Sequence, residues 1–283
     1  MAGEEKKVAL KGSTAVGAVI DYGEDAGAGF ENQTQADISI PFLAVLQALS
    51  PQCEGDDTAL RPGMLFNTVS EEAYKSSEGT LFVPGLTDHV VVEWKPKDKG
   101  GGIVAVHSLD SDIFLQAKER STEFGNYKTP DGNELVETFY VYGAQVDEDK
   151  ETVLGPLIIA FTSTKIKKYK AWQSKLNMFA HRKHGMTAKP PLFAHLTRVT
   201  AVKDKNPKGD FFNFQLQPAN GDVFSSLLPP DSEALAAARQ VRQMVKDGLA
   251  KADYSSADKT TGGSADDTGQ TAGQNGDPDK APF

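Results

Sequence analysis

The chain has 283 residues, of which 39% are hydrophobic, and it carries a formal net charge of −9. This composition is enough for a real core in one large domain or two, and no apolar run approaches the roughly 18 residues of a membrane span. Residues 1–12 lack the apolar centre of a signal peptide, and the single cysteine, Cys53, excludes an internal disulfide and a multi-cysteine zinc site. We therefore expect a cytoplasmic protein in a reducing compartment, without membrane contact.

Composition divides the chain into three parts. Residues 1–33 are rich in Gly, Ala and acidic side chains, so we interpret them as a flexible arm. Residues 253–283 contain no Ile, Leu, Val or Met and carry six Asp against two Lys, which predicts a disordered acidic tail. The folded core is therefore expected over residues 34–252.

The core is predicted to begin with a helix. Thr34 and Asp37 resemble a capping box, and Pro41 suits a first helical turn. The expected helix runs from about Ile38 or Pro41 to Leu49, with four side chains facing inward: Phe42, Val45, Leu46 and Leu49.

Short β runs bounded by turn residues follow, with one helix expected over Ser111–Arg120. The first four predicted strands are Met64–Val69, Thr80–Val83, His89–Trp94 and Ile103–His107. The two longest, Leu135–Val146 and Val153–Thr162, are joined by an Asp-Glu-Asp-Lys turn that predicts an antiparallel hairpin. A second hairpin is expected from Leu192–Val202 and Asp210–Gln217, across a lysine-rich turn.

A last helix is predicted after Asp231 and Ser232, either of which can cap it. Its apolar residues recur at helical spacing, so it should pack on the sheet. Strands and turns at this spacing, with helices between them, predict an α+β fold: an antiparallel sheet or a partly open, OB-like barrel with added helices.

The segment 163–208 differs most from the rest of the chain. It holds twelve Lys and Arg residues against one acid, Asp204, so the other residues together carry −20. Aromatic residues are distributed through and beside it. Cations that follow a phosphate backbone, together with rings on which bases stack, are typical of a single-stranded nucleic-acid groove. The alternative is a solvated helix face followed by an ordinary strand.

Helical spacing arranges the first half of this segment. If Thr164 to about His184 is one helix, a single stripe contains Lys165, Lys168, Trp172, Lys175, Phe179 and Arg182. Tyr169 lies in the neighbouring stripe, which we expect to face the core. Trp172 and Phe179 either stack on bases or widen the apolar face, with lysine stems passing over them. The predicted nucleic-acid-binding residues are Lys165, Lys168, Tyr169, Trp172, Lys175, Phe179, Arg182, Lys203 and Phe212.

Enzymatic readings have little support in the sequence. There is no Gly-rich phosphate loop, because Lys99 to Gly102 has no following helix with Lys-Ser/Thr. His181, His184 and His195 are interpreted as basic-surface histidines rather than metal ligands. Asp110 and Asp112 form a carboxylate pair of the kind that a nuclease uses for Mg²⁺, but without an obvious third partner. We expect no catalytic residues, no metal and no cofactor.

The end of the tail carries a resemblance. The last residues read Asp277-Pro278-Asp279-Lys280-Ala281-Pro282-Phe283. An acidic Gly/Gln-rich tail with this ending resembles the C-terminal tip of bacterial single-stranded DNA-binding proteins, although it has fewer Asp and contains a lysine. The resemblance implies that Asp277, Asp279, Pro282 and Phe283 dock on replication or recombination proteins.

A second resemblance lies in the core. Residues 40–43, 136–143 and 160–165 resemble a family of phage early-region proteins associated with single-stranded DNA binding. Together these features predict a sequence-tolerant, non-catalytic single-stranded DNA-binding protein acting in phage DNA replication or recombination. The alternatives are a single-strand annealing recombinase and a structural or host-interaction protein with a basic face. The oligomeric state stays open, a homo-oligomer included.

Overall fold

The computed structural model describes residues 28–29, 39–54, 59–207, 209–249 and 251–252. The chain divides into two units, residues 1–34 and 35–283, and every element described below belongs to the second. The predicted arm lies outside the described residues apart from residues 28 and 29, and the predicted tail lies outside them entirely.

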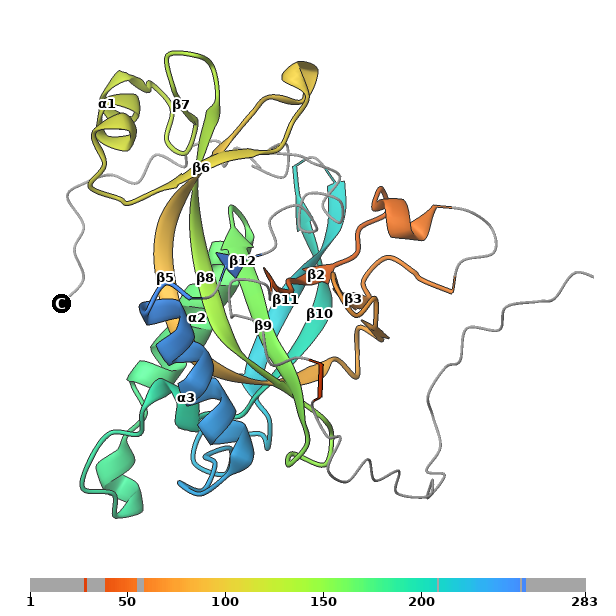
Figure 1. Ribbon diagram of the computed structural model, residues 1–283, viewed down its shortest axis with the longest axis vertical. Helices are drawn as coiled ribbons and strands as arrows, with labels where there is room; N and C mark the ends of the chain where they lie inside the picture. Colours follow the sequence, from red (N-terminus) through yellow and green to blue (C-terminus); the bar gives the residue numbers. More distant parts are fainter. Residues whose placement is uncertain (1–27, 30–38, 55–58, 208, 250, 253–283) are drawn as a thin grey trace, which may run out of the picture. The chain divides into compact units, whose positions relative to one another are not determined.

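A seven-stranded antiparallel sheet forms the centre of the fold, as Figure 1 shows. Its two long strands, β5 (Thr80–Trp94) and β8 (Glu134–Val146), pair along almost their whole length. The other strands are β6 (Ile103–His107), β7 (Tyr127–Lys128), β9 (Val153–Thr162), β10 (Thr197–Asn206) and β11 (Gly209–Pro218). The start of β5 also pairs with β10 and its end with β6, whereas the start of β8 pairs with β7 and the rest with β9.

Both faces of this sheet are covered, because successive side chains of a strand point to opposite faces. Val141 and Ile159 belong to a core cluster that includes helix α2 (Lys165–Asn177). Tyr140 and Ile158, their neighbours in β8 and β9, belong to a cluster with helix α3 (Glu233–Lys246). The two helices therefore pack on opposite faces of the sheet.

The hairpin predictions are confirmed. β8 pairs with β9, and β10 pairs with β11 from Thr197↔Pro218 to Asn206↔Gly209, further toward the turn than predicted. The beginning of the predicted strand at Leu192 is instead the short 3-10 helix η6 (Leu192–Ala194). Helix α1 (Asp112–Arg120) also lies where it was expected.

The runs predicted as separate strands over Thr80–Val83 and His89–Trp94 form the single strand β5. The sequence signal for a break, Pro84 and Gly85, instead marks a register shift in the pairing with β8. A Cβ at Gly85 would lie 2.4 Å from the carbonyl oxygen of Ala238, so glycine here lets α3 approach the strand closely.

Helix α3 begins where it was predicted. Ser232 is its N-cap, and its hydroxyl accepts a hydrogen bond from the Leu235 N–H at 3.5 Å. The helix buries Ala234, Leu235, Ala238 and Val241 against the sheet.

The predicted helix from about Ile38 or Pro41 to Leu49 is wrong. Its described residues form β1 (Ser39–Ile40) and β2 (Leu43–Val45), and β2 joins a small sheet with β3 (Leu65–Asn67) and β4 (Ala73–Tyr74). Phe42 and Leu43 are buried in different clusters, as a strand between two cores requires, whereas Leu49 is 88% exposed. β1 pairs in parallel with β12 (Lys251–Ala252), so the two ends of the described core lie side by side.

The confirmed class is α+β with antiparallel sheets that stay partly open instead of forming a closed barrel. β2 follows a parallel bridge between Phe42 and Ile158 of β9, and the Ile158 N–H donates to the Pro41 carbonyl at 2.9 Å. Between β2 and β11 no strand ladder forms among the described residues, and the side chain of Gln47 spans that gap.

Candidate nucleic-acid interface

Helix α2 presents its aromatic residues to the core. Tyr169, Trp172 and Leu176 are at most 7% exposed and pack in the cluster of β8, β9 and β11. The Tyr169 ring lies 4.7 Å from that of Phe139, and burial raises the pKa of Tyr169. Tyr169 and Trp172 cannot offer a ring face to a base unless helix α2 separates from the sheet. Their prediction as base-stacking residues is therefore corrected.

The helix is also shorter than predicted. It ends at Asn177, and a 3-10 turn, η5 (His181–His184), follows with Arg182 and Lys183 exposed. The single stripe expected from Lys165 to Arg182 therefore does not exist. The buried side of α2 is formed by Tyr169, Trp172 and Leu176, which are three and four residues apart and therefore lie on the same side of the helix.

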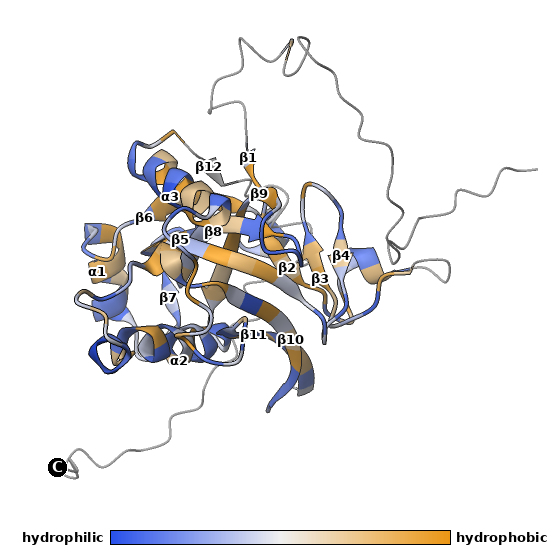
Figure 2. Ribbon diagram, turned by 90° about the horizontal axis from the view of Figure 1, so that it is seen from below, coloured by the Kyte–Doolittle hydropathy of each residue, from blue (hydrophilic) through white to orange (hydrophobic). Residues whose placement is uncertain are grey.

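The exposed surface of α2 is basic. Lys167, Lys170 and Lys175 are exposed on this helix, and we call them, with Arg182 and Lys183, the basic face. Within the described part of the chain none of these five side chains forms an ion pair with a carboxylate. Figure 2 shows α2 next to the β10–β11 hairpin, with hydrophilic residues along the helix.

Other predicted cations have acidic partners. Lys168 Nζ lies 3.4 Å from Asp204 Oδ2, which connects α2 to β10, and Lys203 Nζ lies 2.6 Å from Asp210 Oδ2 across the β10–β11 hairpin. Lys165, at the start of α2, is half-buried. Phosphate would have to compete with these carboxylates, so Lys168 and Lys203 are weaker candidates than the basic face.

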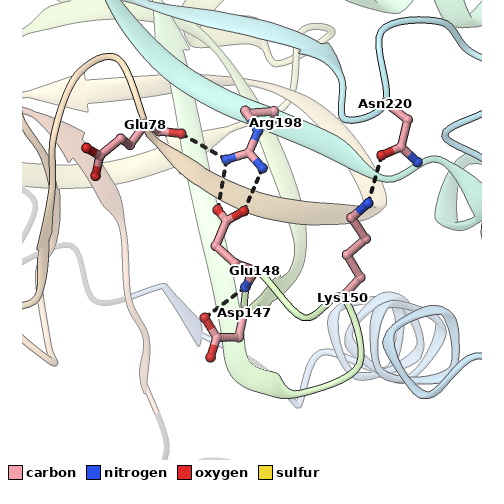
Figure 3. A network of polar contacts seen from close by, with 6 residues as sticks. All are labelled: Glu78, Asp147, Glu148, Lys150, Arg198 and Asn220. Atoms are coloured by element: carbon pink, nitrogen blue, oxygen red, sulfur yellow. Dashed lines mark hydrogen bonds and ion pairs between the residues drawn. The ribbon is translucent and has the colours of Figure 1, made fainter. Parts of the chain in front are cut away.

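Arg198 is committed to the fold, as Figure 3 shows. Its guanidinium donates to both carboxylate oxygens of Glu148 at 2.8 Å and to the carbonyl of Glu78 at 2.9 Å. The hydrogen bonds from Arg198 lower the pKa of Glu148. Nearby, Lys150 Nζ donates to Asn220 Oδ1 at 2.8 Å. This network connects three turns of the core and leaves Arg198 unavailable to a ligand.

The phenylalanines in and after segment 163–208 differ in accessibility. Phe212 is half-buried, and its ring covers Gly63, where a Cβ would lie 2.6 Å from a ring carbon. Phe214 is 2% exposed. Phe179 is half-buried against the core and has a second neighbour, the ring of His184.

That neighbour belongs to a column of three rings, Phe179, His184 and Phe224, which we call the aromatic column. The Phe179 and His184 centroids are 5.3 Å apart, and those of His184 and Phe224 are 4.3 Å apart, with interplanar angles of 29° and 20°. Phe224 is 44% exposed. Sequence reasoning missed Phe224 because it lies in the connection between β11 and α3, forty residues after His184, where no periodic pattern indicates a contact.

The predicted surface histidines differ in burial. His195 is buried, so its prediction as a basic-surface histidine is wrong, whereas His184 is exposed in the aromatic column. No group of three His, Cys, Asp or Glu side chains suited to a metal ion occurs in the described part of the chain. The described helices are also all too short or too polar to cross a membrane.

A family model for the Pam3 phage gp34-like protein matches residues 9–251. The chain belongs to this family. The Pam3 phage gp34-like match spans the described core up to Lys251, including the basic face and the aromatic column, and it indicates a phage protein. No curated protein and no solved structure matches the chain.

Proposed function

We propose that the protein is a non-catalytic, sequence-tolerant single-stranded DNA-binding protein that acts in phage DNA replication or recombination. The supporting observation is the basic face: five exposed cations on α2 and η5 that have no carboxylate partner among the described residues, in a chain of net charge −9. An acidic protein that gathers exposed cations on one surface favours a polyanionic ligand there, and the phage family is compatible with DNA as that ligand.

The basic face would bind the phosphate backbone and not the bases. Lysine and arginine contacts to phosphate carry no sequence information, so affinity should depend little on base composition. Each neutralised phosphate of a single strand contributes about −0.7 to the slope of log K against log salt. Five contacts therefore predict a slope of about −3.5, or roughly a hundredfold loss of affinity between 50 and 200 mM salt.

The test is fluorescence anisotropy with labelled oligo-dT, a mixed-sequence strand, a duplex and an RNA of equal length. The triple variant Lys167→Glu, Arg182→Glu, Lys183→Glu should lose most of its affinity for single strands and have a shallower salt slope. A matched control, Lys95→Glu, Lys128→Glu, Lys246→Glu, changes the net charge equally at three exposed positions, one directly after β5, one in β7 and one in α3. Equal weakening in both variants would contradict the proposed site, and no binding by the wild type would contradict the function.

The same protein can also be tested for strand annealing. Two complementary labelled strands mixed with the protein report pairing by energy transfer. Faster pairing than in the protein-free control would reassign the chain to the annealing recombinases.

A further inference from the structure

We propose that the exposed ring of Phe224, at the outer end of the aromatic column, is a stacking platform for an unpaired base of single-stranded DNA. This inference rests on the proposed function and identifies the side chain that would contact a base of the bound strand. Tyr169 and Trp172, the aromatic residues of helix α2, are buried and cannot do so.

The column supports its outer ring from beneath. Phe179 packs on the core cluster, His184 stacks on Phe179, and Phe224 stacks on His184 at 4.3 Å. One face of the Phe224 ring is thus occupied by His184, while the side chain remains 44% exposed. A partly exposed ring that is already stacked on one neighbour is the kind of side chain on which single-strand-binding proteins stack a base.

The segment that carries Phe224 is held rigidly. Asp222 accepts hydrogen bonds from the Ser225 N–H at 3.0 Å and the Ser225 hydroxyl at 2.6 Å. The Ser226 hydroxyl donates to the Asp222 carbonyl at 2.7 Å, and Asn220 Nδ2 donates to the Ser225 carbonyl at 2.7 Å. Val223, beside Phe224, is 8% exposed in the core. Little conformational freedom is therefore lost when a base stacks on the ring.

Charge around the column fits a nucleotide better than an apolar partner. Arg182 and Lys183 are exposed on the same 3-10 turn as His184 and belong to the basic face. A base on Phe224 would leave its flanking phosphates near these cations. The nearby Asp222 carboxylate keeps its negative charge, because the hydrogen bonds from Ser225 lower its pKa, and the two cations outnumber it.

The experiment measures affinity by anisotropy for oligo-dT and for an abasic strand of the same length. The variants are Phe224→Ala, Phe224→Trp and the control Phe124→Ala, which removes another exposed phenylalanine, 85% exposed near α1. Phe224→Ala should weaken binding to oligo-dT on the order of 5- to 150-fold and leave binding to the abasic strand almost unchanged. Phe224→Trp should keep the affinity, and oligo-dT should quench its added emission.

The outcomes separate the two proposals. If the wild type binds oligo-dT and Phe224→Ala binds it as tightly as Phe124→Ala does, the platform is overturned and the proposed function stands. Equal losses on oligo-dT and abasic DNA would show a structural role for Phe224 and would also overturn the platform. If the wild type binds neither strand, the proposed function fails, and the platform fails with it.

Discussion

The side-chain amide of Gln47 pairs with both backbone groups of Phe212. Gln47 Nε2 donates to the Phe212 carbonyl at 2.8 Å, and the Phe212 N–H donates to Gln47 Oε1 at 2.9 Å. One side chain thus makes the two hydrogen bonds that a neighbouring strand would make to this residue of β11. Gln47 thereby connects the segment after β2 to β11, and these two strands belong to different sheets.

Gln47→Ala should destabilise the fold by about 1–3 kcal/mol, because it leaves two half-buried backbone groups without partners. Gln47→Glu should recover less than half of the loss, since a carboxylate accepts from the N–H but cannot donate to the carbonyl. Urea unfolding followed by circular dichroism measures both. Gln217→Ala, at an exposed position of β11, is the control and should change stability very little.

Trp172→Ala should destabilise the protein by about 3–5 kcal/mol, the cost of removing a large buried ring. Its indole Nε1 has no hydrogen-bond partner among the described residues, so Trp172→Phe loses no hydrogen bond and should cost much less. Thermal unfolding compares the two variants. A Trp172→Ala protein that folds normally but fails to bind DNA would contradict the burial of this residue and restore it to the interface.

Acid should weaken the fold through His195. Burial, and to a smaller extent Lys189, lowers the pKa of His195 from 6.5 to about 4. Between pH 6.5 and pH 4, His195 is protonated in the unfolded chain but neutral in the folded chain. The free energy of unfolding is therefore highest above pH 6.5 and falls as the pH is lowered toward 4. The loss is about 1.4 kcal/mol per pH unit in that window.

The check is the unfolding free energy of the wild type and of His195→Leu, measured between pH 7 and pH 4. The wild-type curve should fall more steeply than that of the variant. Parallel curves would mean that His195 takes up its proton without unfolding.

The acidic tail should compete with DNA for the basic face. A tether of charge −4 stays at high effective concentration near the cations. Truncation after Ala252, which keeps β12, should therefore strengthen DNA binding several-fold at low salt, with the difference fading as salt rises. Equal binding by the truncated and full-length proteins at low salt would show an inert tail.

Phe283 tests the tip separately. Asp277, Asp279, Pro282 and Phe283 lie outside the described residues, and their role as a docking tip stays a prediction. Deleting Phe283 removes no side-chain charge, so DNA affinity should hold, whereas capture of a replication or recombination partner should be lost. Pull-downs with both proteins measure this, and unchanged capture would contradict the tip.

The sequence predicted the fold best where local signals and tertiary contacts agree. The turn before Val153 and the cap at Ser232 act over a few residues, so the β8–β9 hairpin and α3 were predictable. Pro41 to Leu49 was not, because the spacing of Phe42, Val45 and Leu46 suits a helix equally well. Only contact with β9 and β3 makes this segment a strand.

The candidate site was less predictable, for the same reason. The cations were visible as a charge excess, but which stripe of α2 is buried depends on the apolar surface of β8, β9 and β11 that meets it. The spacing placed Trp172 with the lysines, and packing placed it in the core. Phe224 joins His184 across forty residues of chain, a contact without any signal in the periodicity of either segment.

Because β5 pairs with β10 at one end and with β6 at the other, neither end of the sheet is an independent folding unit. Solvent deuterium should reach the amides of Phe82 and Val92 at similar rates, although they lie ten residues apart and have different outer neighbours. Phe82 and Val92 are both 0% exposed, and both pair with residues of β8. Their amides are released only when the whole core opens, so the slowest-exchanging hydrogens should trace this one strand pair from end to end.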